Sequence, residues 1–398
     1  MKTYKVSLKS GLEIAYTDKK RWFWILSSVF PLQAIAGIYI HHITNNQLWL
    51  FLPFTFSYIL APLLDYILGE DTNNPPDEIS LALNADTYYR VLTFLAVPMH
   101  ILSMLVIAWW IGSQNLDWWA YFGLSIIAGI VSGLGINTGH ELGHKRGKLE
   151  KNLAKIVLAV PFYGHFTIDH NHGHHRDVAT PDDASSSRMG ENFYQFLYRE
   201  IPSAITRSFQ IENQRLSRRQ QHFFCLNNQI LQSYALSITL QGTIIIILGI
   251  KMLPFLVLHN AFAWFQLSSA NYIEHYGLLR MKENSGHYER CKPHHSWNSN
   301  HIFSNLVLFH LQRHSDHHTH PTRRYQSLRH YQELPSLPNG YLGCYLIAYI
   351  PWLWFYVMDK RLLGLTHIQG DMTKINIHPK KKEFLMNKYR QNEYQEAQ

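Results

Sequence analysis

The chain is poor in cysteine. Its 398 residues include three cysteines, Cys225, Cys291 and Cys344, which lie far apart and form no CxxC pair. This distribution indicates neither a disulfide framework nor a metal site built from thiolates. The basic N-terminal segment leads into an apolar run without a small-residue cleavage site, so we expect no cleavable signal peptide.

Acidic residues are also few. The chain has 28 Asp and Glu residues against 36 Lys and Arg residues, which gives a formal net charge of +8. A basic excess is compatible with nucleic acid, anionic lipid or an acidic protein partner. Because the chain carries no recognisable DNA- or RNA-binding motif but has long apolar segments, we expect a lipid bilayer and no nucleic acid as partner.

Histidine and long apolar segments, in contrast, are abundant: the chain has 25 histidines. A bilayer core of about 30 Å needs roughly 20 apolar residues in a helix. The predicted transmembrane helices are residues 22–42, 47–68, 89–111, 118–138, 230–250 and 253–272. The run Tyr341–Met358 is shorter and contains Pro351, and we interpret it as interfacial or packed on the membrane-proximal domain. The expected fold is an all-α integral membrane protein with six transmembrane helices.

The placement of Lys and Arg predicts the orientation. The short loops 42–46 and 112–117 contain neither residue, whereas the long region after the fourth span is basic. The positive-inside rule therefore places this region and both termini in the cytoplasm. The predicted segments are a cytoplasmic N-terminal segment (1–21), transmembrane helices one to four (22–138), a cytoplasmic region (139–229), transmembrane helices five and six (230–272), a second cytoplasmic region (273–374) and a polar C-terminal tail (375–398).

Four histidine clusters fall on the predicted cytoplasmic side, as HELGH at 140–144, HNHGHH at 170–175, NYIEH at 271–275 and HSDHH at 314–318. Histidines three or four residues apart share a helix face and can bind one metal together. The candidate ligands are His140, His144, His170, His174, His175, His275, His314, His317 and His318. One metal ion takes only about four to six ligands, so nine histidines indicate two metals in a histidine-rich helical cap.

Each cluster has an acidic neighbour. Glu141, Asp169, Glu274 and Asp316 are predicted to hydrogen-bond the ligand imidazoles and fix their tautomers. Imidazole suits Zn, Cu, Fe and Ni, so the ligand type alone does not choose the metal.

Other histidines leave alternatives open. We exclude His172 because its helical phase differs from that of His170 and His174. His310 lies four residues before His314 on the same predicted stripe and stays undecided. His100, within the third span, is either a site residue or a side chain that forms a hydrogen bond to a neighbouring helix. Supporting or substrate-path roles are open for His294, His295 and His301.

Longer stretches around the clusters carry a family resemblance. They are NTGHELGHK (137–145), YGHF (163–166), NHGHHRDVATP (171–181), NYIEHYGLLR (271–280), HHSWNSNH (294–301) and LQRHSDHHTHPTR (311–323). In these stretches the chain resembles the membrane-bound, rubredoxin-dependent alkane 1-monooxygenases of the fatty acid desaturase-like superfamily, from about residue 19 to residue 377. Two residues depart from the pattern: the family usually has Glu at Asp169, and Lys or Arg at His172.

The resemblance implies a diiron site in which the nine histidines hold two iron ions. It implies the hydroxylation of medium- to long-chain n-alkanes at the terminal carbon to 1-alkanols, with O₂ as the oxidant. The electrons would come one at a time from rubredoxin, itself reduced by rubredoxin reductase. The corresponding location is the cell inner membrane.

Two further sets of residues are predicted from their chemistry. Ser57 is small among bulky aromatic neighbours and is a candidate for lining the substrate channel, as is His100; packing against another helix is the alternative for both. A basic docking surface for acidic rubredoxin, or alternatively for anionic headgroups, could include Arg199, Arg207, Arg215, Arg218, Arg219, Lys292, Arg323 and Arg324.

The alternatives differ in reaction or in class. An acyl-lipid desaturase or hydroxylase and an aromatic-methyl monooxygenase share the looser histidine pattern, and their products would separate them. A metal transporter would need metal-binding residues within the spans, where acids are scarce apart from Asp65. A histidine-rich metal buffer would leave the six spans unexplained.

Overall fold

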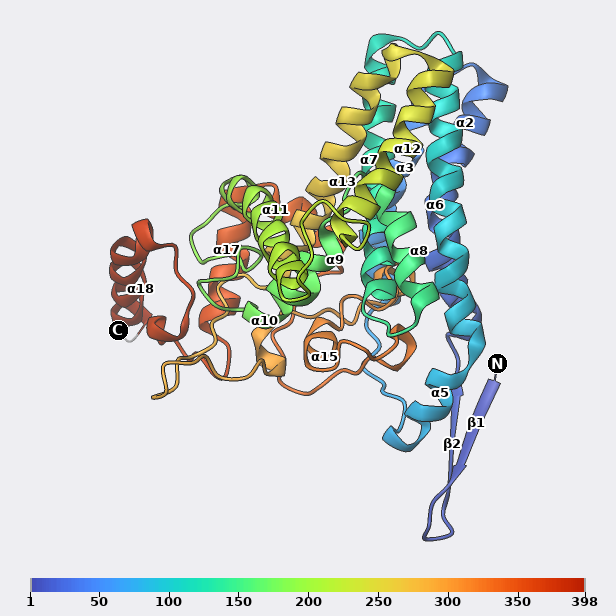
Figure 1. The fold of residues 1–398 in the computed structure, drawn as a ribbon. Coiled ribbons are helices and arrows are strands. Elements are labelled where there is room, and N and C mark those ends of the chain that lie inside the picture. The colour runs from blue at the N-terminus through green and yellow to red at the C-terminus, as the bar shows by residue number, and fades with distance from the viewer. Residues whose placement is uncertain (1, 397–398) are drawn as a thin grey trace.

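The computed structural model describes residues 2–396. Figure 1 shows a column of long helices standing beside a broad group of shorter helices and loops, which we call the cap (residues 144–228 and 275–396). Helix-to-helix turns close the far end of the column, and both chain ends lie on the side of the cap. The arrangement matches the predicted division into a membrane part and a histidine-rich part.

Five helical stretches of the column, among the described residues, are long and apolar enough to cross a membrane. They are Arg21–Thr44, Gln47–Leu68, α6 (Thr87–Ser113), α7 (Trp118–Gly143) and α12 (Gln229–Leu248). The first consists of η1 (Arg21–Trp24), α1 (Ile25–Val29), η2 (Phe30–Leu32) and α2 (Gln33–Thr44). The second consists of η3 (Gln47–Phe51), α3 (Leu52–Thr55), the π-helix η4 (Phe56–Leu60) and α4 (Ala61–Leu68).

The sixth predicted span is α13 (Leu253–Glu274), which follows the turn η7 (Ile250–Met252) and packs against α7 (Figure 1). A hydrogen bond of 2.8 Å from Gln241 Nε2 of α12 to Asn260 Oδ1 joins it to α12. The 22 residues of α13 would extend about 33 Å. It does not meet the same hydropathy criterion, because its buried face carries polar residues such as His259 and Gln266. These are paired inside the protein; His259 Nε2, for example, lies 2.7 Å from Ser132 Oγ of α7.

Two glycines let α7 and α13 approach closely. A Cβ atom at Gly129 would lie 2.6 Å from the backbone oxygen of His259, and one at Gly133 would lie 2.5 Å from Cβ of Gln266. Real side chains do not fit such spaces, so glycine is required at both positions. The close packing aligns the cap ends of α7 and α13, from which the first and third histidine clusters project.

The segment 341–358 is not a straight span. It forms α16 (Tyr341–Ala348) and the start of α17 (Pro351–Leu363), which are bent by 120° at the break. The pair would add a sixth membrane-crossing candidate to the five described above if the two bent helices were counted as one span. Since α16 packs against α13, the interpretation as a packed segment agrees with the structure.

The cap holds the largest cluster of buried apolar side chains, to which Trp297, Trp354 and Phe193 contribute. Its longest helix, α11 (Phe193–Ser217), begins at a capping box of Asn192 and Gln195. The other cap helices are α8 (Lys148–Ala159), α9 (Phe166–Asp169), the π-helix η6 (His170–His174), α10 (His175–Asp177), η8 (Pro293–His295), α14 (Ile302–Val307), α15 (His314–Thr319), η9 (Tyr325–Ser327), η10 (Met372–Lys374), η11 (Pro379–Lys381) and α18 (Lys382–Glu396).

The N-terminal segment departs from the all-α expectation. It forms an antiparallel hairpin of β1 (Lys2–Ser7) and β2 (Glu13–Asp18). Tyr4 of the hairpin and Arg21 both donate hydrogen bonds to Asp86, at 2.6 and 2.7 Å. Asp86 precedes α6 and follows the short helices η5 (Asp77–Ile79) and α5 (Ser80–Ala85), so this network ties the hairpin to the column.

The predicted C-terminal tail begins with paired residues. Ile375 bridges to Leu278, and Ile377 bridges to Met189, before α18. The remaining segment divisions stay predictions.

Candidate metal centre

The structure brings the nine predicted histidines together in two adjoining groups. Within each group, one nitrogen of every ring lies within 4.8 Å of the others. The first group is His140, His144, His170, His175 and His317, and the second is His174, His275, His314 and His318. Four separate chain segments supply these side chains, and all but two of the rings are fully buried.

The rings of the first group point their nitrogens at one another. His317 Nε2 lies 3.0 Å from His140 Nε2 and 3.1 Å from His175 Nε2, which in turn lies 3.1 Å from His170 Nε2. Neutral imidazoles gain little from such contacts unless a hydrogen or a cation lies between them. The geometry therefore fits a metal ion at their common centre.

The second group has the same character. His314 Nε2 lies 3.2 Å from His275 Nε2 and 2.9 Å from His318 Nε2. His174 completes the group, and its Nε2 atom is buried without a hydrogen-bond partner among the described residues, as is His144 Nε2 of the first group. Buried nitrogens of this kind are expected where a metal takes the lone pair.

A π-helix divides the second sequence cluster between the groups. Residues 170–174 form η6, which places His170 and His175 in the first group and His174 in the second. His172 is exposed and belongs to neither group, in agreement with its exclusion. A Cβ atom at Gly173 would lie 2.6 Å from Arg207 Nε, so the turn packs tightly on α11.

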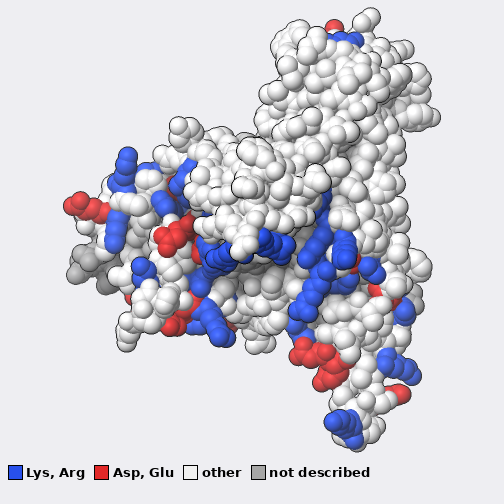
Figure 2. All heavy atoms as spheres, viewed as in Figure 1, with Lys and Arg blue, Asp and Glu red and all other residues white. Residues whose placement is uncertain are grey.

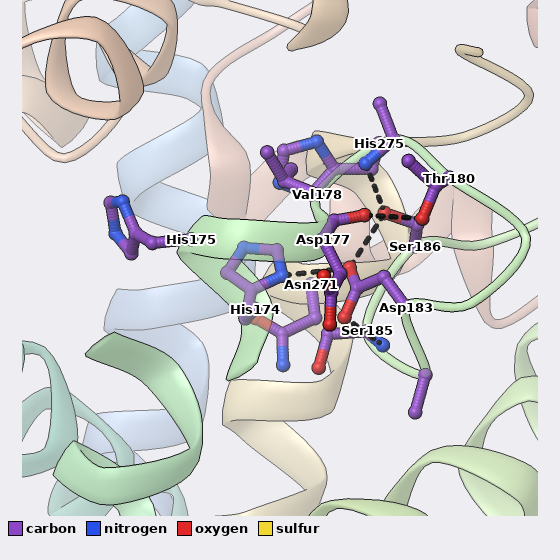
Figure 3. A network of polar contacts seen from close by, with 12 residues as sticks. His174, His175, Asp177, Val178, Thr180, Asp183, Ser185, Ser186, Asn271 and His275 are labelled. Atoms are coloured by element: carbon purple, nitrogen blue, oxygen red, sulfur yellow. Dashed lines mark hydrogen bonds and ion pairs between the residues drawn. The ribbon is translucent and has the colours of Figure 1, made fainter. Parts of the chain in front are cut away.

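Asp183 is the carboxylate that orients His174 (Figure 3). Its Oδ2 atom lies 2.8 Å from His174 Nδ1 and accepts a hydrogen bond of 2.7 Å from Ser186 Oγ. Burial alone would raise the pKa of Asp183, but His174 and Arg207 hold it well below its usual range. Sequence reasoning missed this residue because it lies nine positions after His174, beyond any helical spacing.

The four predicted carboxylate partners have different roles. Of these four carboxylates, Glu274 is the one with an ion-pair contact to a grouped histidine in the part of the chain that the structure describes. Its Oε2 atom lies 3.3 Å from His314 Nε2. The other three pair with cations: Glu141 with Lys145, Asp169 with Arg207, and Asp316 with Arg323. They fix the surrounding segments rather than the rings themselves.

Burial sets the protonation state of the clustered histidines. It lowers the pKa of His275 to about 3. Burial and the neighbouring histidines also lower the pKa values of His144, His170, His175, His314, His317 and His318 well below the usual value. These rings are therefore neutral at physiological pH and offer lone pairs to a cation.

The undecided histidines lie outside both groups. His310 is buried, and its Nδ1 atom lies 3.0 Å from the Tyr325 carbonyl. His294, His295 and Glu289 form a third group of possible ligand atoms. However, the Lys292 backbone N–H donates to His295 Nδ1 at 2.9 Å, so the Nε2 atom of this ring carries the hydrogen and lacks a free lone pair. The His295 carbonyl in turn lies 3.1 Å from His275 Nδ1 and orients that ring.

A narrow cavity reaches the two groups from the column. His140, His170 and His314 line its metal end, and most other lining side chains are apolar: Ile130, Leu134, Phe166, Leu267, Ala270, Leu308, Leu311 and Leu342. Ser57 and His100 are buried but are not among the lining residues. Ser57 accepts a hydrogen bond from Gln33, and His100 Nε2 lies 3.4 Å from Thr138 Oγ1. Their assignment to a channel stays a prediction.

Most of the predicted docking residues are already paired with carboxylates. The pairs are Arg199–Glu191, Arg207–Asp169, Arg215–Glu212, Lys292–Glu289, Arg323–Asp316 and Arg324–Glu150. Arg218 and Arg219 are exposed and form no ion pair with the side chains that the structure describes. Figure 2 shows Lys and Arg side chains in a band where the cap meets the column, whose upper part is almost uncharged.

Comparisons with known proteins agree with this site. The family model described as "Fatty acid desaturase" matches residues 116–354. An alkane 1-monooxygenase of Pseudomonas putida is 52% identical over 95% of this chain and 93% of its own length. Alkane 1-monooxygenase 1 of Alcanivorax borkumensis is 50% identical over 94% and 92%. The xylene/toluene monooxygenase hydroxylase component XylM of Pseudomonas putida is more distant, at 28% over 56% and 58%.

Identity of this extent covers the column, the cap and all four histidine clusters. The chain therefore belongs to the alkane 1-monooxygenase family, a group of oxidoreductases within the fatty acid desaturase superfamily.

Proposed function

We propose that the protein hydroxylates the terminal carbon of medium- to long-chain n-alkanes to 1-alkanols, with O₂, two iron ions and electrons from reduced rubredoxin. The observation that carries the proposal is the position of the two histidine groups at the end of a largely apolar cavity. An alkane has no polar group, so only such a cavity can bind and orient it.

The donor set supports two iron ions. Nine imidazoles in groups of five and four suit first-row transition metals, and each group has enough ligands for one ion. When bound, the iron pair supplies the activation of O₂ and the oxidation of the C–H bond. The protein holds the rings of His174 and His275 in place through Asp183 and the His295 carbonyl, which face their Nδ1 atoms.

The apolar cavity positions the substrate and excludes water. An alkane dissolved in the bilayer is already out of contact with water, so the accepted chain length depends on the shape and depth of the cavity rather than on the burial of further methylenes. The walls direct one chain end toward His140, His170 and His314. Terminal selectivity follows from this shape, since internal C–H bonds are held farther from the histidines.

The bilayer supplies the substrate, and the cap receives the electrons. The apolar column and the basic band at its base (Figure 2) support an orientation in the cell inner membrane with both termini in the cytoplasm. On this side an acidic rubredoxin would meet the exposed Arg218 and Arg219. Replacing both with Glu should raise the KM for rubredoxin, most strongly at low ionic strength. The control Lys5→Glu with Lys9→Glu changes the charge equally in the hairpin and should not.

The direct test supplies the reconstituted protein with iron, rubredoxin, its reductase, ¹⁸O₂ and a series of n-alkanes, acyl lipids and xylenes. We expect ¹⁸O-labelled 1-alkanols, which are absent with His314→Ala. Labelled benzylic alcohols or desaturated lipids in their place would assign the protein to a neighbouring reaction of the superfamily. The same assay with Ser57→Trp tests the channel: we expect the longest accepted alkane to become shorter, and an unchanged series refutes a channel role for Ser57.

A further inference from the structure

Three amide side chains line the cavity, and two of them lie close to the grouped histidines. Asn137 of α7 and Asn271 of α13 line it together with His140 and His314. Asn137 lies three residues before His140, and Asn271 lies four residues before His275, so each amide shares a helix face with a grouped histidine. Both are therefore at the metal end of the cavity.

The amide nitrogens of both residues are already used. Asn137 Nδ2 donates a hydrogen bond of 2.8 Å to the Leu308 carbonyl. Asn271 Nδ2 donates one of 3.1 Å to Glu200 Oε1, while Ser268 Oγ donates to the other oxygen of Glu200 at 2.7 Å. Because these partners act as acceptors, they fix which end of each amide faces them. The Oδ1 atoms are left toward the cavity.

Among the described residues no hydrogen bond ends on either Oδ1 atom, and neither atom is among the fully buried ones that lack a partner, so both are open to the cavity that the two residues line. A carbonyl oxygen that an alkane covers without donating a hydrogen bond costs about 1–3 kcal/mol relative to one that receives a hydrogen bond. Leucine, of nearly the same size, would suit an alkane better at both positions. The cavity is therefore built for a molecule that donates a hydrogen bond at its metal end.

We infer that Asn137 and Asn271 form a subsite that accepts the hydroxyl hydrogen of a primary alcohol. The inference rests on the proposed function, since the 1-alkanol is the species of that reaction that has both an apolar chain and a donor at the terminal carbon. The two oxygens bind the product after it forms, whereas the affinity for the alkane comes from the apolar walls. Glu200 is a positioning residue that keeps the Asn271 oxygen turned inward.

The test compares a 1-alkanol with the isomeric alkyl methyl ether, which has the same number of heavy atoms but no O–H donor. Each compound displaces a radiolabelled n-alkane from the purified, metal-loaded protein in lipid nanodiscs, with protein-free nanodiscs as the correction for partition. We expect the alkanol to displace the label at about three- to tenfold lower concentration than the ether, which corresponds to one net hydrogen bond. This measurement requires no turnover and no variant.

Variants then show which side chains cause the preference for the alkanol over the ether. Asn137→Leu and Asn271→Leu should bring the alkanol-to-ether ratio close to one. Gln266→Leu removes another amide of the cavity, farther from the histidines on α13, and should keep the ratio of the unmodified protein. Equal displacement by alkanol and ether in the unmodified protein overturns the subsite, as does a ratio that survives both asparagine variants. Failure of the labelled alkane to bind at all would instead count against the proposed function.

Discussion

His174 shows how a single residue of the centre is held. Its Nδ1 atom faces Asp183, whose charge is itself stabilised by Ser186 and Arg207. An imidazole whose second nitrogen faces a carboxylate is a better metal ligand, because its tautomer is fixed and its basicity is raised.

Asp183→Asn should therefore weaken metal binding while the fold remains. The variant keeps the shape but loses the charge and can turn its NH₂ group toward the ring. We expect the affinity of the second histidine group for metal to fall about 10- to 100-fold, as for other partners of metal-bound histidines. Competition with a chromophoric chelator measures this metal affinity. The matched control is Asp182→Asn at the exposed neighbouring position, and equal affinity in both variants would remove the role of Asp183.

Glu200 gives a prediction for pH. Burial raises its pKa to about 7, and Asp169 adds to this, whereas Ser268, Asn271 and Arg199 oppose it. In the unfolded chain a glutamate titrates near about 4.3. Between these values the folded protein binds the extra proton, so its stability declines as pH rises from about 4 to about 7 and stays lower above that. The decline amounts to about 4 kcal/mol.

Glu200→Gln should remove this decline. The thermal midpoint of the unmodified protein should fall more between about pH 5 and pH 8 than that of the variant. Glu283→Gln, at an exposed position, is the control and should behave like the unmodified protein. If Glu200→Gln keeps the full decline, the carboxyl group is not protonated in the folded state.

At the level of elements, spacing predicted which histidines belong to the site but not how they divide. The groups exist because η6 is a π-helix, and α-helical periodicity would have placed His170 and His174 together. Sequence neighbours were also poor guides to contacts: Glu141, Asp169 and Asp316 pair with cations, whereas the distant Asp183 contacts a ring.

The predicted spans show a similar limit. All six predicted spans are helical, and five meet the criterion of length and apolar composition, whereas α13 is too polar for it because other helices pair its polar side chains, as Ser132 pairs His259. A hydropathy average along the sequence does not include the hydrogen-bond partners that other helices provide. The hairpin β1–β2 was missed because its pairing depends on distant contacts with Asp86.

The π-helix leads to a prediction with two closely related variants. His172→Ala should retain both metals, since the ring is exposed and lies outside both groups. Deleting His172 should remove the extra residue of the bulge and shift His170 relative to His174 and His175, so that metal binding is lost. Metal content per protein, measured after removal of free metal, distinguishes them. Full metal content in the deletion variant would show that the π-helix is not required.

At the scale of the whole molecule, the metal centre connects parts that are distant in the chain. The grouped histidines extend from His140 to His318, on or at the ends of α7, η6, α10, α13 and α15. A ligand that binds only the folded state stabilises it by about 4 kcal/mol at a thousandfold excess over its Kd. The centre should therefore stabilise the contact between the column and the cap, not just one helix.

Removing the metal should lower the thermal midpoint of the entire protein. We expect a chelated sample to unfold at a lower temperature than one reloaded with Fe²⁺, and reloading should restore the midpoint. His314→Ala, which removes one nitrogen of the second group, should show a smaller difference between the two samples. Identical midpoints with and without metal would contradict a linking role for the centre.

The separation of charge between column and cap predicts how the molecule lies in the membrane. The loop between α6 and α7 is at the far end of the column, whereas residue 283 lies in the cap. In a variant without native cysteines, a membrane-impermeant maleimide should label Asn115→Cys in intact spheroplasts but Glu283→Cys only after lysis, because the positive-inside rule predicts a cytoplasmic position for the basic cap. Both positions are exposed, so burial does not explain a difference. Labelling in the opposite order would reverse the orientation and put the predicted rubredoxin-binding side outside the cytoplasm.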